Sequence, residues 1–546
     1  MGEIVAGVVG SVLADLGVGH AFGVVGSGNF HVTNALRAKG VPFTAARHEG
    51  GAAAMADGYS RLAPLPAALS VHQGCGLTNA MTGIAEAAKS RTPMIVLAGD
   101  TAGAAVNSNF RVDQDALAAS VGAVPERVYG SSSVVADVVR AYKTAVHGRR
   151  TVVVSLPLDV QAAPADPAPP ALPALVPPAP VRPAASAVAE FAGLLAAAER
   201  PVFVAGRGGR TAGPGIAALG RRAGALLATS AVANGLFEGE EYNLGISGGF
   251  STPLAAELIS GADLIVGWGG ALNMWTMRQG TLIGDGAKVV QVDDDQAVLG
   301  VHRPVDLPIL GDCAATAADT LDALKDENKP GYRTPEVSER LAAGRWWNGV
   351  PTDDIGTGDR IDPREFSKTL DRLLPAERVV AIDSGNFMGY PSAYLRVPDE
   401  FGFCFTQAFQ SIGLGLSSGI GAALAQPGRL AVVGTGDGGF LMAISELETA
   451  VRLGTPMVVA VYNDAAYGAE VHHFGGDTDL GAVTFPDTDI AAVARGFGAD
   501  GVTVRGADDM RAVGSWVADP SGVLVIDAKI ASDGGSWWLA EAFRGH

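Results

Sequence analysis

Short apolar runs alternate with stretches of helical spacing along most of this chain. Runs bounded by glycine and polar residues are typical of strands that are buried on both faces of a parallel sheet. They lie near Ala21–Val25, Ala67–Val71, Met94–Ala98, Thr151–Leu156, Leu264–Gly267, Val289–Val292, Val379–Ile382, Leu430–Val433 and Met457–Val461. The alternation of strand and helix predicts an α/β fold built from doubly wound parallel sheets.

Composition divides the chain into three such blocks. The first covers residues 1–166, and nine prolines from Pro164 to Pro183 predict an extended, semi-rigid linker after it. The second block covers residues 185–326, and its first predicted strand begins near Arg200. A polar stretch from Asp326 to Arg360 leads to the third block, residues 360–546. We therefore expect three domains, each with its own sheet.

Length and charge narrow the classes of protein further. A chain of 546 residues is too long for one core, and a hydrophobic content of 48% against 18% charged residues is typical of a globular protein. The net charge of −18 argues against nucleic acid or an anionic membrane as a partner. We expect a cytoplasmic protein, because neither a spanning apolar run nor a cleavable leader is recognisable. Cys75, Cys313 and Cys404 are too scattered for a disulfide framework or a zinc site.

The most specific chemical pattern lies in the third block. Leu430–Val433 is followed by the glycine-rich turn Gly434–Gly439, which contains Asp437, and Phe440–Leu453 has helical spacing. A glycine-rich turn that leads into a helix brings free N–H groups close to an anion. Asp464 follows the next predicted strand, 27 positions after Asp437. Two carboxylates beside a diphosphate require a cation, and Mg²⁺ is commonly shared between carboxylates and phosphates.

A nicotinamide dinucleotide site is the alternative for this turn. Gly434, Gly436 and Gly439 also satisfy G-x-G-x-x-G. Asp437 would repel a bare pyrophosphate, however, and the dinucleotide pattern places its acid about 20 residues on. Asp464 lies 30 residues after Gly434, so the spacing disfavours this alternative. An ordinary turn with incidental acids is a further alternative, against which the partner acid and the following Tyr467-Gly468 argue.

The acidic motif and the order of the three blocks resemble the thiamine-diphosphate (ThDP) decarboxylase and acetohydroxyacid synthase superfamily. The resemblance covers nearly the whole chain and is strongest around residues 20–115 and 380–475. It implies a pyrimidine-binding domain (1–166), a central Rossmann-like domain (185–326) and a diphosphate-binding domain (360–546). The metal ligands that it implies are Asp437, Asp464 and the backbone carbonyl of Ala466. Many members carry Asn where this chain has Asp464, and a shift of one residue would make Asn463 the ligand instead.

The resemblance also implies which residues contact the cofactor. Ala46–Tyr59 resembles the segment whose acid hydrogen-bonds the aminopyrimidine ring, and this acid maps onto Glu49. An effect on the helix dipole is the alternative role for Glu49. Ile412 takes the place of the bulky residue that bends the cofactor, or simply packs on the sheet. The other implied contacts are Ser384, Gly385, Asn386, Gln410, Gly436, Gly438, Gly439, Asp464, Tyr467 and Gly468.

Substrate-side residues draw on several branches of the superfamily. Val71–Met81 and Gly23–Asn29 resemble benzoylformate decarboxylase, which implies catalytic roles for His72 and Ser27, with Gln73 beside them. Ordering of the loop is the alternative role for His72. Glu470 has the spacing of the proton donor of pyruvate decarboxylase, so His72 and Glu470 would form a proton relay. Asn109–Gln114 resembles the synthase loop, although Arg111 replaces its glutamine. His31, His472 and His473 are further candidates to line the site.

The leading hypothesis is an enzyme that uses ThDP and Mg²⁺ to decarboxylate a 2-oxo acid. The product is then protonated to an aldehyde or joined to an acceptor aldehyde or ketone. The alternatives are an acetolactate synthase-like carboligase that makes a 2-hydroxyketone, a NAD-dependent oxidoreductase, and a non-catalytic paralogue. The resemblance implies a homodimer or homotetramer with sites between subunits. Gly206–Arg210 resembles the family's degenerate nucleotide fold, and binding of FAD or ADP there stays open.

Overall fold

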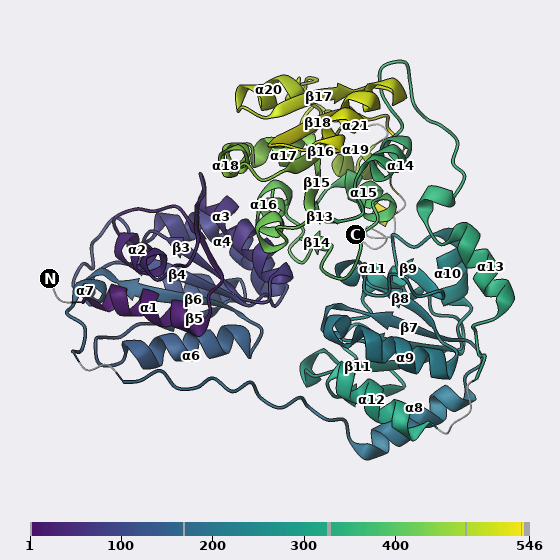
Figure 1. The fold of residues 1–546 in the computed structure, drawn as a ribbon, viewed down its shortest axis with the longest axis horizontal. Coiled ribbons are helices and arrows are strands. Elements are labelled where there is room, and N and C mark those ends of the chain that lie inside the picture. Colours follow the sequence, from purple (N-terminus) through teal and green to yellow (C-terminus); the bar gives the residue numbers. More distant parts are fainter. Residues whose placement is uncertain are drawn as a thin grey trace.

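A computed structural model describes residues 3–167, 170–324, 329–475, 478–534, 536, 538 and 539 of this chain. It contains three six-stranded sheets in which every strand pairing is parallel, each flanked by helices (Figure 1). The expectation of three doubly wound α/β sheets is confirmed. No helix among the described residues is long and apolar enough to cross a membrane. Cys75, Cys313 and Cys404 are all free thiols.

The N-terminal sheet has the order β2-β1-β3-β4-β6-β5. Its strands are β1 (His20–Gly23), β2 (Phe43–Ala45), β3 (Ala67–Val71), β4 (Met94–Asp100), β5 (Val124–Arg127) and β6 (Thr151–Pro157). Its helices are α1 (Val5–Leu16), α2 (Phe30–Ala38), α3 (Glu49–Leu62), α4 (Cys75–Lys89), α5 (Gln114–Ser120), α6 (Val134–Val146) and α7 (Leu158–Ala162). β3, β4 and β6 are buried along their whole length, which explains their continuous apolar sequences.

The central sheet has the order β12-β11-β10-β7-β8-β9. Its strands are β7 (Pro201–Ala205), β8 (Leu226–Thr229), β9 (Asn243–Ile246), β10 (Leu264–Trp268), β11 (Lys288–Asp293) and β12 (Leu307–Leu310). Its α-helices are α8 (Ala185–Ala197), α9 (Gly213–Ala223), α10 (Pro253–Ser260), α11 (Met274–Met277), α12 (Cys313–Ala323) and α13 (Pro335–Gly344). Short 3-10 helices span Arg207–Ala212, Ala231–Ala233, Arg278–Gly280, Gln296–Val298 and Trp347–Gly349. The polar stretch between the second and third blocks therefore holds a helix, α13, as well as loops.

The C-terminal sheet has the order β14-β13-β15-β16-β18-β17. Its strands are β13 (Arg378–Ile382), β14 (Phe403–Phe405), β15 (Leu430–Gly436), β16 (Met457–Asn463), β17 (Asp500–Val504) and β18 (Val523–Lys529). Its α-helices are α14 (Pro363–Leu373), α15 (Gly389–Tyr394), α16 (Gly415–Ala425), α17 (Asp437–Met442), α18 (Ser445–Leu453), α19 (Gly468–His473), α20 (Ile490–Gly496) and α21 (Met510–Ala518). Short 3-10 helices span Asn386–Met388 and Ala507–Asp509. The helical spacing over Phe440–Leu453 corresponds to two helices, α17 and α18, and the first begins at Asp437.

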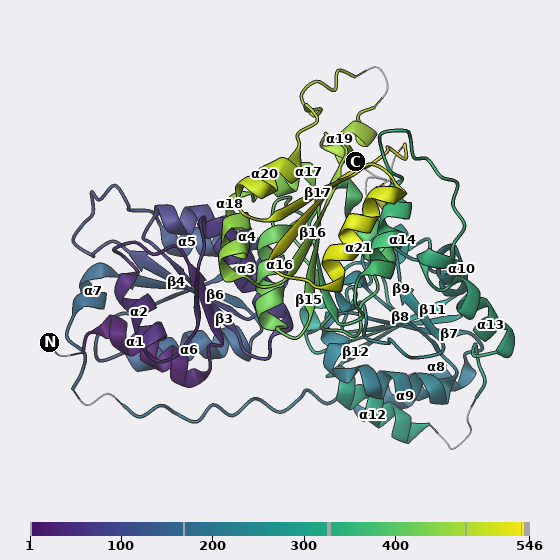
Figure 2. The same cartoon turned by 45° about the horizontal axis from the view of Figure 1, so that its top comes forward.

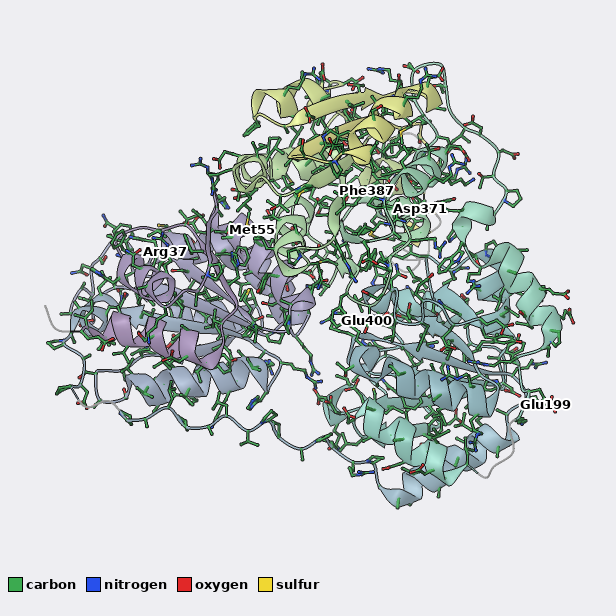
Figure 3. All side chains as sticks on the ribbon, viewed as in Figure 1. Arg37, Met55, Glu199, Asp371, Phe387 and Glu400 are labelled. Carbon is green, nitrogen blue, oxygen red and sulfur yellow. The ribbon has the colours of Figure 1, made fainter. Side chains whose placement is uncertain are left out.

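The N-terminal and C-terminal sheets meet through α3 and α16, which lie side by side in both views (Figures 1 and 2). Glycines allow this close approach. A Cβ on Gly421 would lie 2.1 Å from the carbonyl oxygen of Met55, and one on Gly58 would lie 2.5 Å from that of Ser418. Met55 is labelled at this junction in Figure 3. One hydrophobic core therefore continues from the first sheet into the third. A long segment without helix or strand connects the first sheet to the central block along the lower edge of Figure 2.

Candidate active site

Two acidic side chains lie together at the carboxyl ends of β15 and β16. Asp437 opens α17 directly after β15, and Asp464 directly follows β16. Their carboxyl groups lie close enough to affect each other's pKa. Burial raises the pKa of Asp437 to about 7, and the negative charge of Asp464 adds to this rise. Burial also raises the pKa of Asp464. A pair of carboxylates that must share a proton is a favourable place for a divalent cation.

Several glycines lie beside this acid pair, at positions where a side chain would collide with neighbouring atoms. A Cβ on Gly468 would lie 2.3 Å from Oδ2 of Asp464, and one on Gly438 would lie 2.7 Å from the ring of Tyr467. A Cβ on Gly436 would lie 3.2 Å from the ring of Phe387. Tyr467 in turn packs edge-on against another aromatic ring, Phe485, at a centroid distance of 4.9 Å. The expected diphosphate-contacting glycines therefore lie within one narrow, aromatic-walled region around the two acids.

The geometry favours Asp464 over its neighbour as the partner of Asp437. The amide nitrogen of Asn463 donates to Asp527 at 2.8 Å, and its oxygen accepts the N–H of Ala465 at 3.1 Å. Both ends of the Asn463 amide are therefore engaged by residues other than Asp437. Among the described residues no group of three or more His, Cys, Asp or Glu side chains converges for a metal. A cation at Asp437 and Asp464 would thus take its other oxygen ligands from backbone, water or a phosphate.

The segment that carries Ile412 is held by a buried acid, Asp383, which directly precedes the expected cofactor contacts Ser384 and Gly385. Asp383 directly follows β13 and accepts hydrogen bonds from the N–H groups of Gly413 and Leu414, both at 3.1 Å. It also accepts the hydroxyl of Thr435 at 3.0 Å. Burial raises the pKa of Asp383 to about 6, and these donors oppose the rise. Asp383 therefore ties the Ile412 segment to the strand end that precedes Asp437.

The loop after Asp383 carries three of the expected cofactor contacts. Ser384 and Gly385 are partly exposed, and Gly385 has a positive φ of 136°. Asn386 is buried, and its oxygens accept hydrogen bonds from Ser536 and from the indole N–H of Trp538. A Cβ on Gly468 would lie 3.2 Å from Asn386, so this loop borders the acid pair. Asn386 therefore binds the C-terminal segment through Ser536 and Trp538.

The N-terminal sheet contributes a second group of candidate residues. Glu49 is the first residue of α3, where it is partly exposed and accepts a hydrogen bond from the amide of Asn79 at 3.0 Å. A Cβ on Gly76, at the start of α4, would lie 3.3 Å from both Glu49 Oε1 and His72 Cβ. Glu49 and His72 are therefore neighbours across a glycine. The charge of Glu49 also suits a helix N-terminus.

His72 follows β3 and makes contacts within its own block. Its Nε2 lies 3.3 Å from Oγ of Ser27, and its Nδ1 lies 3.1 Å from the carbonyl oxygen of Gln73. The Phe110 ring packs edge-on against it at 5.2 Å between centroids. The side-chain oxygen of Gln73 is buried without a hydrogen-bond partner among the described residues. A buried polar atom of this kind has an unmet need for a donor.

Several candidates do not come together within one chain. Glu470 is exposed on α19, which lies well away from the N-terminal sheet in Figures 1 and 2. Among the described residues it forms no hydrogen bond or ion pair with His72. Arg111 and His31 are exposed, and His473 lies on α19 with Glu470. Gln410 is exposed beside Ile412 and has a positive φ of 60°.

Comparisons with known proteins match all three blocks. Three family models, described as the N-terminal TPP binding domain, the central domain and the C-terminal TPP binding domain of thiamine pyrophosphate enzymes, match residues 5–119, 188–324 and 383–528. A probable 2-ketoarginine decarboxylase (AruI) of Pseudomonas aeruginosa is 30% identical over 508 residues, covering 89% of this chain and 87% of that protein. An acetolactate synthase of Bacillus subtilis is 28% identical, covering 95% and 91%. A sulfoacetaldehyde acetyltransferase of Alcaligenes xylosoxydans is 26% identical, covering 90% and 87%.

Proposed function

This chain belongs to the thiamine pyrophosphate enzymes, and from that premise we propose that it decarboxylates a 2-oxo acid with bound ThDP and Mg²⁺. The product would be protonated to an aldehyde or joined to an acceptor carbonyl. The observation that carries the proposal is the close pair of Asp437, which is buried, and Asp464, because two such carboxyl groups require a cation or a shared proton. The similarity to a probable 2-ketoarginine decarboxylase and to an acetolactate synthase supports both outcomes.

Residues at the carboxyl ends of the C-terminal sheet would hold the cofactor and metal. Asp437, Asp464 and the carbonyl of Ala466 would coordinate Mg²⁺, and Gly436, Gly438 and Gly439 leave room for a diphosphate. Ile412 would support the cofactor from the loop that Asp383 fixes. When bound, ThDP supplies an electron sink that makes loss of CO₂ from a 2-oxo acid possible. The protein's part is to orient the cofactor and to control protons around it.

Glu49 would hydrogen-bond the cofactor, and Asn79 would keep its carboxylate in place. Glu49 is partly exposed in the single chain, and the acid pair lies in a different block. We therefore propose that two copies complete each site, in a homodimer or homotetramer. Exposed aromatic and apolar side chains flank both halves of the site, as this arrangement needs: Phe30 (52% exposed), Phe110 (44%), Met442 (61%) and Phe474 (52%).

His72 and Glu470 would move the proton that releases an aldehyde. In a second copy α19 could approach the N-terminal sheet of the first, which the single chain does not allow. We expect His72→Ala and Glu470→Gln each to slow aldehyde release by roughly a hundredfold, because general acid catalysis contributes about that much or more. CO₂ loss should slow less. Rapid-quench measurement of CO₂ and aldehyde in one sample checks this, and unchanged aldehyde release in both variants would contradict the relay.

A carboligase is the second candidate, and Phe110 supports it. Its ring packs on His72 and is 44% exposed, so it would shield a product bound beside His72 from water. The two outcomes are separated by supplying ThDP, Mg²⁺ and a panel of 2-oxo acids without an acceptor. Free aldehyde in the same amount as CO₂ supports a decarboxylase. A condensed hydroxyketone without free aldehyde supports a synthase and reduces His72 and Glu470 to binding roles.

FAD or ADP is proposed as a ligand of the central block. A cavity of about 780 Å³ is lined by Gly206–Gly208, Gly269, Gly270, Asp293 and Asp294 at the ends of central strands. Arg207 borders it and makes no hydrogen bond or ion pair with the described residues, while burial lowers its pKa to about 10. A cation without a partner favours a phosphate.

We expect Arg207→Ala to weaken binding of the nucleotide by roughly tenfold, because a charged hydrogen bond is lost. Equilibrium dialysis with ADP and with FAD measures this change. Binding of neither compound by the unaltered protein, or equal binding by the variant, would contradict the nucleotide proposal.

A further inference from the structure

A buried glutamate of the N-terminal block reaches across to the loop that precedes Ile412. Glu86 lies on α4 and is 1% exposed. Its two carboxylate oxygens accept the backbone N–H groups of Ala408 at 3.1 Å and Phe409 at 2.6 Å. These two residues belong to the loop between β14 and α16. Glu86 therefore fixes a segment of the C-terminal block from outside it.

Arg61, which is itself held by Asp57, keeps this glutamate in position. The guanidinium of Arg61 donates to Glu86 at 2.7 Å and also pairs with Asp57, which is completely buried. The hydroxyl of Thr92 donates to Asp57 at 2.6 Å. Burial would raise the pKa of Glu86, but the charge of Arg61 and the two loop N–H groups outweigh it and keep the pKa below its ordinary value. The carboxylate is thus charged and fully committed where it lies.

The loop itself shows why it needs such support. Gln410 has a positive φ of 60°, a conformation that costs a residue with a side chain free energy, and Gly413 follows at 87°. Glu86 holds this loop at Ala408 and Phe409, and only Gln410 and Ser411 separate Phe409 from Ile412. Asp383 holds it immediately after Ile412, through the N–H groups of Gly413 and Leu414. Ile412 therefore lies in a strained segment that is anchored on both sides by buried carboxylates.

A second buried glutamate, Glu446 of the C-terminal block, contacts the N-terminal block in the same way. Glu446 lies on α18 of the C-terminal block and is 1% exposed. It accepts the backbone N–H groups of Arg47 at 3.1 Å and His48 at 2.8 Å, directly before Glu49. The hydroxyl of Thr449 donates to its other oxygen at 2.7 Å. Gly51 allows this approach, since a Cβ there would lie 2.4 Å from Glu446.

We propose that Glu86 and Glu446 are positioning residues that fix the Ile412 loop and the Glu49 helix start across the α3–α16 interface. The inference rests on the proposed function for the roles of Ile412 and Glu49. Packing between α3 and α16 is non-directional and would tolerate sliding, whereas hydrogen bonds from N–H groups to a carboxylate are short and directional. Each block therefore sets the geometry of a cofactor-facing element in the other.

Two substitutions test whether these contacts have local effects that differ from a general loss of stability. Glu86→Gln replaces one acceptor oxygen by an N–H donor, while Arg61 keeps its pairing with Asp57. Glu446→Leu keeps the approximate volume and removes both acceptors, because a glutamine oxygen could still accept both N–H groups. Asp371→Asn is the matched control. Asp371 is a buried carboxylate that pairs with Arg378 at 3.0 Å and accepts the N–H of Arg396 at 2.9 Å. Figure 3 shows Asp371 away from Met55, which marks the α3–α16 interface.

Hydrogen–deuterium exchange of the full-length variants is the first measurement. Loss of a hydrogen bond to a charged group should speed exchange roughly tenfold. We expect Glu86→Gln to do so in residues 405–415 only, Glu446→Leu in residues 44–52 only, and Asp371→Asn in neither. Wild-type exchange in the two named segments, or the same acceleration in the control, would overturn the proposal.

The dissociation constant of ThDP with Mg²⁺, measured by calorimetry on the same samples, is the second measurement. Both glutamate variants should bind ThDP roughly tenfold more weakly than wild type and the control. Wild-type affinity in both would overturn the positioning roles. If the unaltered protein does not bind ThDP, the proposed function is wrong, and the exchange data still decide whether the two contacts exist.

Discussion

Replacing Glu49 by glutamine is expected to reduce CO₂ release by at least about a hundredfold, because an amide cannot share a proton with the cofactor as a carboxyl group does. Glu49 opens α3 and is already oriented by Asn79, and a glutamine of the same length can keep that contact. The fold and the affinity for ThDP should therefore change little. Initial rates of CO₂ release, with the dissociation constant of ThDP from the same preparation, measure the two effects separately.

Glu126→Gln is the control for this experiment. Glu126 is also a carboxylate of the N-terminal block, but it pairs with Arg140 at the edge strand β5. Its loss should leave turnover unchanged. Substantial remaining activity in Glu49→Gln would remove Glu49 from the proposed role, and equal loss in Glu126→Gln would show that any charge in this block matters.

Replacing Asp437 by asparagine should have opposite effects on the metal-free and the cofactor-bound protein. Without metal, the variant loses a buried carboxylate that is repelled by Asp464, so its melting temperature should rise or stay level at pH 8. With ThDP and Mg²⁺, it lacks a metal ligand, so the added stabilisation seen in wild type should largely disappear. Thermal melts with and without both ligands measure this. A variant that is still stabilised like wild type by ThDP and Mg²⁺ would contradict the assignment of Asp437.

The same acid pair predicts how wild type depends on pH. The pKa of Asp437 in the folded, metal-free protein lies at about 7, above its ordinary value of 3.8, so the folded state holds a proton that the unfolded chain loses. Its stabilising effect is complete below that ordinary value and is lost as the pH rises through 7. Mg²⁺ competes with this proton. Stabilisation by Mg²⁺ and ThDP should therefore be larger at pH 8 than at pH 6, and equal stabilisation at both would contradict the shared proton.

Most strands that are buried on both faces could be predicted from the sequence, but the buried interior strands β8 and β18 and the strands at sheet edges were not predicted. Ala67–Val71 coincides with β3, since its five residues are all buried and apolar or small. The edge strands β5 and β17 carry exposed or half-buried polar residues, and the edge strand β2 has only three residues, of which Thr44 alone is buried, so none of them has a continuous apolar run. β14 is only three residues long. Their identity depends on a neighbouring strand, which the local pattern does not contain.

The same distinction applies to the site. Asp437 and Asp464 stand next to strand ends that can be recognised locally, and parallel strands bring such ends together. Glu86 and Glu446 contact residues more than 300 positions away in the sequence, through backbone N–H groups that any residue provides. No spacing rule connects them. Glu446 also lies just after the break between α17 and α18, which the continuous helical spacing over Phe440–Leu453 did not predict.

The most direct test of the account is CO₂ release by protein that has been stripped of ligands with a chelator and dialysed. A panel of 2-oxo acids is supplied with ThDP alone, with Mg²⁺ alone, and with both. The account predicts CO₂ only when both are present, and no release by Asp437→Asn under the same conditions. CO₂ release without ThDP, or no release from any acid while a nicotinamide dinucleotide binds and supports oxidation, would contradict it.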